Sequence, residues 1–152
     1  MKKLLVTGLN GFVGRHLQAL LEGASSSWKL LESPAHDLLE PASLDAWLQD
    51  DCPDAVIHLA GQTFVPEAFR DPAQTIKVNL LGTLNLLQAL KRRGFAGAFL
   101  YVSSGDVYGQ VAEDELPIRE CRLPQPRNPY AVSKFAAELL CLQWGYVEPW
   151  RI

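Results

Sequence analysis

Short apolar runs alternate with longer segments of helical periodicity along this chain of 152 residues, and the alternation predicts an α/β fold. The links between these segments are short, which favours parallel strands joined by crossover helices. A glycine-rich turn, TGLNGFVG, follows the first apolar run directly. At roughly 100–200 residues per domain, the length is that of one domain. We therefore expect one doubly wound parallel sheet with helices on both faces.

Four apolar runs are the predicted strands. Each is short and rich in aliphatic residues, as strands buried in a parallel sheet are. They are Lys3–Thr7, Lys29–Glu32, Asp54–Leu59 and Phe99–Val102, and a still shorter segment ends at Asp37 and Leu38.

Four amphipathic segments are the predicted helices. In the longest, Ile76, Leu80, Leu84 and Leu87 recur three or four positions apart and form one apolar stripe. Pro129 suits the start of the last helix, where a missing N–H costs nothing. The helices cover Phe12–Leu21, Ala42–Leu48, Ala73–Lys91 and Tyr130–Trp144.

Two further segments connect or follow these elements. A polar, proline-rich loop, Asp106–Pro129, precedes the last helix, and Val147–Ile152 is typical of the start of another strand. A sheet that stops in mid-strand indicates a fragment of a longer protein. We therefore expect the sheet to be truncated at its C-terminal end.

Composition excludes several classes of protein. Hydrophobic residues make up 48% of the chain and charged residues 20%, which is ordinary for a soluble globular domain. The net charge of −3 argues against a nucleic-acid-binding protein, and no apolar run approaches the roughly 20 residues of a membrane span. Three cysteines without a CxxC pair predict free thiols in a reducing cytoplasm. No histidine lies at metal-ligand spacing, so we expect no metal site.

The turn TGLNGFVG has the glycine spacing of a dinucleotide-binding loop. Gly8 permits a tight turn, Gly11 lets the backbone approach a pyrophosphate, and Gly14 lets the helix pack closely on the sheet. The N-terminus of the helix that follows offers N–H groups and a partial positive charge to phosphates. This turn predicts an NAD(P)-binding fold of the Rossmann type.

The residues that would distinguish NAD from NADP are less distinctive. Glu32 lies at about the distance from the glycine turn at which an acidic residue holds the 2′-hydroxyl of NAD, with Lys29 as the nearby cation. Glu32 slightly favours NAD over NADP. An equally good interpretation is that Glu32 is a solvent-exposed residue that does not contact the cofactor. Asp37 is placed either to bind the adenine amino group or to cap a turn. The cofactor is therefore expected to be NADP or NAD.

A second motif, YAVSK, begins the last predicted helix. Tyr130 and Lys134 are four residues apart, so they lie on one face of the helix, one turn apart. An ammonium beside a phenol favours the phenolate, and such a tyrosine can exchange a proton with a carbonyl or alcohol oxygen. Ser104, after a predicted strand, can donate a hydrogen bond to the same oxygen. His58 ends another strand and is interpreted as a buried, hydrogen-bonded core histidine.

Taken together, these segments resemble the extended short-chain dehydrogenase/reductase family, which acts mostly on nucleotide sugars. The matching segments occur in the family's order and spacing along essentially the whole chain. They are TGLNGFVG (Thr7–Gly14), HLAG (His58–Gly61), Asn79 with Gly82-Thr83, SSGDVYG (Ser103–Gly109) and YAVSK (Tyr130–Lys134).

The resemblance implies a role for each matching residue. Tyr130 would be the general acid, Lys134 its electrostatic partner and Ser104 the third catalytic residue. The expected cofactor-binding residues, besides Tyr130 and Lys134, are Gly8, Asn10, Gly11, Phe12, Val13, Gly14, Asp37, Leu38, Leu59, Ala60, Gly61 and Asn79. Thr63 and Glu67, together with Ser104, would face the sugar.

Within the family, the chain is most similar to reductases that act on GDP-4-dehydro-6-deoxy-D-mannose and yield GDP-D-rhamnose. This likeness rests on the segments His58–Pro72, Asn79–Leu90, Ser103–Gly109 and Pro126–Lys134. Related 4,6-dehydratases of dTDP-sugars carry Asp-Glu where this chain has Gly105 and Asp106. A glycine cannot deliver a proton, so the change favours a reductase or an epimerase. The alternatives are a nucleotide-sugar 4-epimerase, a 4,6-dehydratase, or a cofactor-binding fragment without turnover.

The resemblance also implies an organisation for the complete protein. Residues 1–152 would be the NAD(P)-binding domain, and a C-terminal sugar-nucleotide domain would be absent from this chain. Members of the family usually pair through two long helices, here Ala73–Lys91 and Tyr130–Trp144. We therefore expect a homodimer when the protein is full length.

Overall fold

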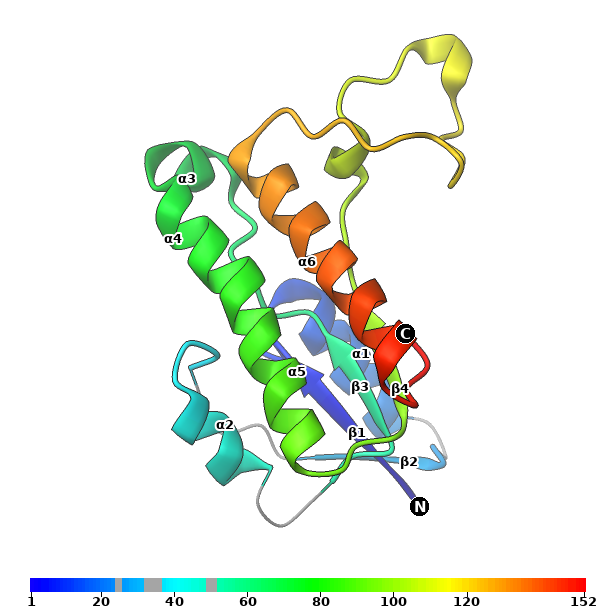
Figure 1. The fold of residues 1–152 in the computed structure, drawn as a ribbon. Helices are drawn as coiled ribbons and strands as arrows, with labels where there is room; N and C mark the ends of the chain where they lie inside the picture. Colours follow the sequence, from blue (N-terminus) through cyan, green and yellow to red (C-terminus); the bar gives the residue numbers. More distant parts are fainter. Residues whose placement is uncertain (24–25, 32–36, 49–51) are drawn as a thin grey trace.

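A computed structural model describes residues 1–23, 26–31, 37–48 and 52–152 (Figure 1). The strands form one sheet in the order β2-β1-β3-β4, and all neighbouring strands are parallel. They are β1 (Lys2–Thr7), β2 (Trp28–Leu30), β3 (Ala55–His58) and β4 (Ala98–Tyr101). The predicted α/β fold with a parallel sheet is confirmed. Glu32, at the end of the predicted second strand, lies outside the described residues.

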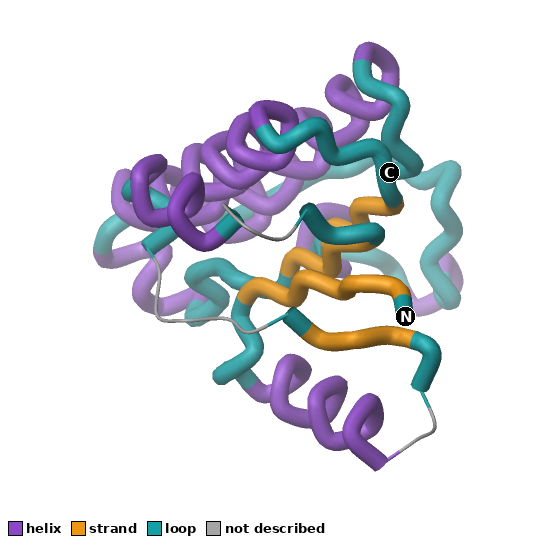
Figure 2. Tube along the Cα trace, turned by 90° about the horizontal axis from the view of Figure 1, so that it is seen from below, coloured by secondary structure: helices purple, strands orange, loops and turns teal. Residues whose placement is uncertain are grey.

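Helices cover both faces of this sheet, as Figure 2 shows, with one helix on one side of the strands and the others opposite. The helices are α1 (Phe12–Gly23), α2 (Pro41–Trp47), α3 (Val65–Arg70), α4 (Pro72–Ile76), α5 (Gly82–Arg92) and α6 (Pro129–Val147), with a π-helical turn η1 (Lys77–Leu81) between α4 and α5. Short 3₁₀ turns, η2 (Gly105–Tyr108) and η3 (Glu113–Glu115), lie in the loop before α6. This loop extends away from the rest of the domain in Figure 1.

Alternating residues of the strands divide the core into two layers. On β1, Leu4 and Val6 pack with Leu17 and Leu21 of α1. The next residue, Leu5, faces the larger layer, which it shares with buried residues of the sheet, α2, α5 and α6. The larger layer includes Leu44, Val56, Leu86, Leu87, Leu90, Phe99 and Cys141. This alternation is what a sheet covered on both faces requires.

The order in which the chain adds strands to the sheet reverses direction between β1 and β3. From β1 the chain passes to β2 on one side, and it then returns across β1 to β3 and β4 on the other. Thr7 pairs with His58 at the carboxyl ends of the two central strands. Ligands of open α/β sheets bind beyond such a switch point. The glycine turn after β1 and the segment after β3 therefore flank the expected ligand position.

The region between β3 and β4 differs from the prediction in two respects. Val65–Arg70 forms an additional short helix, which ends at Asp71. Asp71 also caps the start of α4, where its side chain accepts a hydrogen bond from the Gln74 N–H at 2.9 Å. The helix predicted over Ala73–Lys91 is not uniformly α-helical, because η1 interrupts it with a π-helical turn. An apolar stripe at helical spacing does not report such a turn, which admits one extra residue into the helix.

The C-terminal segment lies along β4. Arg151 forms a parallel bridge with Ala98, and the Phe99 N–H donates a hydrogen bond to the Arg151 carbonyl oxygen at 2.8 Å. The segment predicted to begin another strand, Val147–Ile152, therefore pairs with the sheet at Arg151 alone, because Val147 is still the last residue of α6. Within the described ranges, no helix combines the length and the apolar character that a membrane span requires.

Candidate active site

A cleft of about 460 Å³ lies at the carboxyl ends of β1, β3 and β4. Three strand-end loops and the start of α6 form its walls. Its lining residues are Gly8, Gly11, Phe12, Val13, Gly14, Leu59, Ala60, Gly61, Thr63, Val102, Ser103, Tyr130 and Lys134. Segments that are far apart in the sequence, the glycine turn and the YAVSK motif, thus face one cavity.

The glycine turn is closely packed against the neighbouring backbone. Gly8 has a φ of +74°, and a Cβ there would lie 2.7 Å from the Ala60 nitrogen. A Cβ on Gly14 would lie 2.5 Å from the carbonyl oxygens of Gly8 and Leu9. On Gly11 a Cβ would meet only the Gly8 oxygen, at 3.1 Å, so this glycine opens toward the cleft. The turn therefore leaves the cleft free of side chains just where a pyrophosphate would approach the backbone.

The N-terminus of α1 completes this cradle. The side chains of Phe12 and Val13 are 78% and 55% exposed, and both residues line the cleft. The first N–H groups of a helix have no intrahelical partner and carry the positive end of the helix dipole. The residues present therefore fit the pyrophosphate of a dinucleotide.

Lys134 is the buried cation of the cleft. Its ammonium donates a hydrogen bond to the Val102 carbonyl oxygen at 2.6 Å, and the residue is only 6% exposed. Burial lowers the pKa of Lys134 to about 8, against the opposing influence of Cys141 and Glu138 on the same helix. Tyr130, one helical turn earlier and 9% exposed, lines the same cleft. Both ends of the YAVSK motif thus line the cleft that the glycine turn also lines.

A chain of hydrogen bonds through His58 holds the floor of the cleft. The Ala60 N–H donates to Thr7 Oγ1 at 3.1 Å, which leaves the Thr7 hydroxyl to donate to His58 Nδ1 at 2.6 Å. On the other side, Thr83 Oγ1 donates to the Asn79 carbonyl oxygen, so it accepts a hydrogen bond from His58 Nε2 at 2.9 Å. These directions require the neutral tautomer protonated at Nε2.

Burial keeps this histidine neutral. His58 is 1% exposed, and desolvation, with a smaller contribution from the Lys134 charge, lowers its pKa to about 3. The interpretation of His58 as a hydrogen-bonded core histidine agrees with these contacts. Its role is to connect the end of β1, the end of β3 and α5.

Asn79, in the π-helical turn, connects the cleft floor to the catalytic helix. Its Oδ1 accepts from the Gln62 N–H at 2.7 Å, and its Nδ2 donates to the Gln62 carbonyl oxygen at 2.9 Å and to Ser133 Oγ at 2.8 Å. The Ser133 hydroxyl in turn donates to the Tyr130 carbonyl oxygen at 2.7 Å. Asn79 does not line the cleft, but it fixes the segment after β3 relative to Tyr130.

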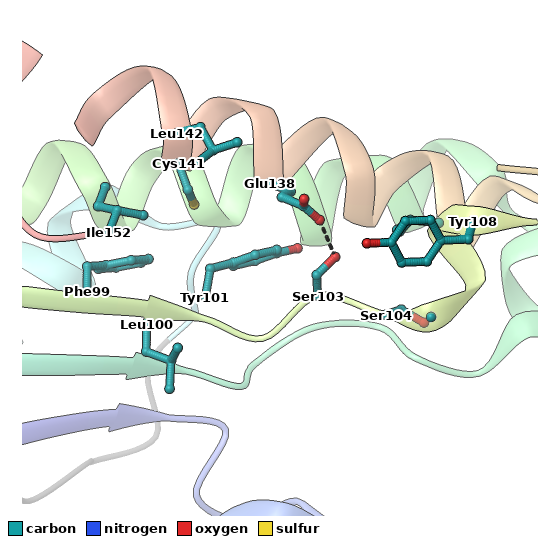
Figure 3. A pocket seen from close by; sticks show the side chains of 12 residues that line it. Phe99, Leu100, Tyr101, Ser103, Ser104, Tyr108, Glu138, Cys141, Leu142 and Ile152 are labelled. Carbon is teal, nitrogen blue, oxygen red and sulfur yellow. Dashed lines mark hydrogen bonds between the residues drawn. The ribbon is translucent and has the colours of Figure 1, made fainter. Parts of the chain in front are cut away.

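Ser104 lies in the pocket next to the cleft. It caps η2 by accepting a hydrogen bond from the Asp106 N–H at 3.2 Å, and it lines a pocket beside β4 that also contains Tyr108 and Glu138 (Figure 3). Ser103 lines both this pocket and the cleft. The structure therefore places Ser103, and not Ser104, on the wall shared with Tyr130 and Lys134.

Several of the expected binding residues lie outside the lining of the cleft. Asn10 is exposed in the glycine turn. Asp37 accepts the Leu39 N–H at 2.8 Å in a turn, and the Leu38 carbonyl oxygen accepts from Asn85 Nδ2 at 2.9 Å. Glu67 pairs with Arg70 within α3. Among the described residues, no group of three His, Cys, Asp or Glu side chains is placed to hold a metal ion.

Two contributors to the cleft were not assigned from the sequence. The carbonyl oxygen of Val102 accepts a hydrogen bond from the lysine ammonium, and Ser103 lines both the cleft and the pocket next to it. Their position in the sequence could have indicated them, because both residues follow β4 directly and the carboxyl ends of parallel strands meet at one edge of the sheet. No pattern in the sequence indicates the partners of their polar atoms.

The fold and the cleft define a dinucleotide-binding Rossmann domain whose cleft is lined by a tyrosine and a lysine of one helix. The model of the NAD dependent epimerase/dehydratase family matches residues 4–146, and the chain belongs to this family. Its resemblance to the nucleotide-sugar dehydrogenases and reductases is thereby confirmed at the level of the family.

Individual relatives are similar along nearly the whole chain. This chain is 69% identical to GDP-6-deoxy-D-mannose reductase of Pseudomonas aeruginosa, over 99% of this chain and 50% of that protein. It is 34% identical to GDP-6-deoxy-D-talose 4-dehydrogenase of Aggregatibacter actinomycetemcomitans, over 90% of this chain and 46% of that protein. The chain thus spans about half the length of the curated relatives it matches.

Solved structures agree with this relationship. The structure of RMD from Pseudomonas aeruginosa in complex with NADPH has a TM-score of 0.95 at 68% identity, over 99% of this chain and 51% of that one. UDP-glucose 4-epimerase of Thermus thermophilus in complex with NAD has a TM-score of 0.87 at 31% identity, over 97% of this chain and 53% of that one.

Proposed function

We propose that this chain is the dinucleotide-binding part of an NADPH-dependent reductase of nucleotide sugars. Its reaction is the reduction of the 4-keto group of a GDP-linked 6-deoxyhexose, from GDP-4-dehydro-6-deoxy-D-mannose to GDP-D-rhamnose. The observation that carries the proposal is the 69% identity to a GDP-6-deoxy-D-mannose reductase over 99% of this chain. Two dTDP-glucose 4,6-dehydratases are only 32% and 35% identical, which favours the reductase over the dehydratase.

Each part of the cleft has a place in this proposal. The backbone at Gly8, Gly11, Phe12 and Val13 would hold the pyrophosphate, the segment Leu59–Gly61 the nearer ribose, and Asp37 and Leu38 the adenine. The bound cofactor supplies a hydride to the substrate carbon. The Tyr130 phenol protonates the oxygen of the substrate, and the Lys134 ammonium stabilises the phenolate that this leaves. From the pocket next to the cleft, Ser104 would orient that oxygen, while Thr63 on the cleft wall and Glu67 of α3 would face the sugar.

NADPH is the proposed cofactor because the structure of the similar RMD was determined with NADPH. A cytoplasmic location is proposed with it, because the cysteines are interpreted as free thiols: the structure has no disulfide among Cys52, Cys121 and Cys141.

A homodimer through the two long helices is supported by exposed apolar side chains on them, among which Leu81 and Leu139 are 45% and 51% exposed. Sedimentation of the protein tests this, and a monomer at all concentrations contradicts it.

The activity is tested with GDP-4-dehydro-6-deoxy-D-mannose and NADPH, in the protein that contains this chain. We expect consumption of NADPH, the D-rhamnose product, and a loss of about 10²–10⁴-fold in turnover for Tyr130→Phe with NADPH binding retained. GDP-mannose with NAD is the substrate pair for the dehydratase alternative, and inversion at C4 without net reduction indicates an epimerase. NADPH binding without any turnover indicates a binding fragment.

A further inference from the structure

Three consecutive residues at the end of β4 are attached to α6. The Tyr101 hydroxyl donates to the Lys134 carbonyl oxygen at 3.4 Å, and the Val102 carbonyl oxygen accepts from the Lys134 ammonium at 2.6 Å. The Ser103 hydroxyl donates to Glu138 Oε2 at 2.6 Å, as Figure 3 shows. The strand end is thus joined to one face of the helix over a full turn.

Glu138 provides the last of these attachments. It lies four residues after Lys134, so both side chains project from the same face of α6. A hydroxyl that donates to a carboxylate makes a hydrogen bond about twice as strong as one between neutral groups. The Tyr108 hydroxyl points toward the same pair in Figure 3. Glu138 itself lies in the neighbouring pocket, outside the cleft that holds Tyr130.

Ser103 forms the wall between the two cavities. It lines the cleft with Tyr130 and Lys134, and it also lines the pocket with Ser104 and Glu138. Its neighbour Val102 holds the ammonium, and its other neighbour, Ser104, begins η2. A shift of Ser103 would therefore move both the lysine's acceptor and the proposed substrate-orienting hydroxyl.

We propose that Glu138 is a positioning residue of the site: by accepting the Ser103 hydroxyl it fixes the end of β4 against α6, and so sets the Val102 carbonyl that holds Lys134 and the direction of Ser104. The effect of Glu138 on the reduction of the substrate rests on the proposed function. The attachment itself is a property of the chain without any ligand, and it is measured separately.

The charge of Glu138 has a second effect on the same lysine. The groups that influence or contact the ammonium are Glu138 and Cys141 on α6, the Tyr101 ring from β4 and the neutral His58 from β3. Of these, the carboxylate and the thiol favour the ammonium against its desolvation. Removing the carboxylate therefore acts on the lysine by charge as well as by position, and Ser103→Ala separates the two effects because it leaves the carboxylate in place.

The first experiment needs no cofactor. Lys134 is titrated by side-chain ¹³C NMR, and hydrogen exchange is measured at the amides of residues 104–107, in wild type, Glu138→Gln, Ser103→Ala and the charge-matched control Glu148→Gln, whose carboxylate pairs with Lys91. We expect Glu138→Gln to lower the midpoint of Lys134 by roughly 0.5 pH unit or more. We expect Ser103→Ala to speed exchange by about tenfold or more, with a smaller change in the midpoint. Wild-type behaviour of both variants overturns the proposal.

The second experiment measures single-turnover reduction by NADPH. We expect Glu138→Gln and Ser103→Ala each to slow it by roughly tenfold, the double variant to be no slower than the worse single variant, and Glu148→Gln to match wild type. Effects that multiply, or an equal loss in Glu148→Gln, overturn the positioning role. If the wild-type protein reduces no sugar nucleotide, the proposed function fails, whereas the NMR and exchange results still decide whether Glu138 fixes the strand end.

Discussion

The ammonium of Lys134 lies over the aromatic ring of Tyr101, 4.3 Å from the ring centroid. The ring face carries partial negative charge and attracts a cation. The last residue of β4 and the residue after it therefore both contact this lysine, through the Tyr101 ring and the Val102 carbonyl oxygen. These contacts stabilise a charge that burial disfavours, and they hold it at the end of the strand that faces Tyr130.

The charge of Lys134 predicts the pH dependence of cofactor binding. Because its pKa is lowered to about 8, the lysine loses its proton as the pH rises through that value. NADPH is expected to bind with constant affinity well below pH 8 and progressively more weakly as the pH approaches and passes that value, as measured by fluorescence titration. Lys134→Met should bind weakly at every pH and lose the dependence. A wild-type affinity that stays constant well above the pKa of the lysine contradicts this assignment.

The buried state of His58 predicts a loss of stability in acid. Its pKa is about 3 in the folded chain against an ordinary value of 6.5, so between these values the unfolded chain binds more protons and stability falls as the pH is lowered. The contribution is about 2 kcal/mol between about pH 7 and pH 5. His58→Asn keeps one donor and one acceptor but does not titrate, so its urea-unfolding free energy should decline less over this range. Equal declines in the two proteins exclude a neutral His58 as the cause.

The two glycines of α1 predict opposite effects of alanine. A Cβ at Gly14 would meet backbone oxygens at 2.5 Å, so Gly14→Ala forces the glycine turn to shift and is expected to cost about 1–3 kcal/mol. At Gly23 no atom of the described residues lies within 4 Å of the added carbon, so Gly23→Ala should be neutral or stabilise by about 0.5 kcal/mol. Denaturant unfolding compares them, and NADPH binding should weaken only in Gly14→Ala. Similar stabilities for the two variants would show that the turn can relax.

The assembly of the cleft follows from elements that the sequence predicts well. Parallel strands bring their carboxyl ends to one edge, so the glycine turn after β1 and the residues after β3 must lie side by side. The helical spacing of Tyr130 and Lys134 places both on one face, whatever the helix packs against. Periodicity and the parallel direction of the strands were therefore sufficient to place these residues at one edge of the sheet, and the adjacency of β1 and β3 in the structure brings them to one cavity.

The supporting contacts depend on information that periodicity does not contain. The Ser103–Glu138 hydrogen bond needs the axial position of α6 relative to β4, and the contacts of His58 need the depth of α5 on the sheet. The π-helical turn that presents Asn79 changes the helix by one residue without disturbing its apolar stripe. Such features arise from tertiary packing, and the sequence alone could not have distinguished Ser103 from Ser104 on the cleft wall.

Asn79 predicts a link between stability and cofactor binding. Its side chain makes three buried or half-buried hydrogen bonds, to both backbone groups of Gln62 and to Ser133, and Asn79→Ala leaves those partners without it. We expect a loss of about 2–4 kcal/mol in the free energy of unfolding, and weaker NADPH binding because Gly61 and Gln62 lose their anchor.

Asn85→Ala is the control for the loss of stability alone. This asparagine lies in α5 and, among the described residues, donates one hydrogen bond, to the carbonyl oxygen of Leu38, which is itself proposed to contact the adenine. It should cost only about 0.5–1.5 kcal/mol. Urea unfolding and fluorescence titration of both variants give the two quantities. If Asn79→Ala lowers stability as expected while NADPH affinity stays at the wild-type value, Asn79 supports the fold alone, and the segment after β3 does not need it to bind the cofactor.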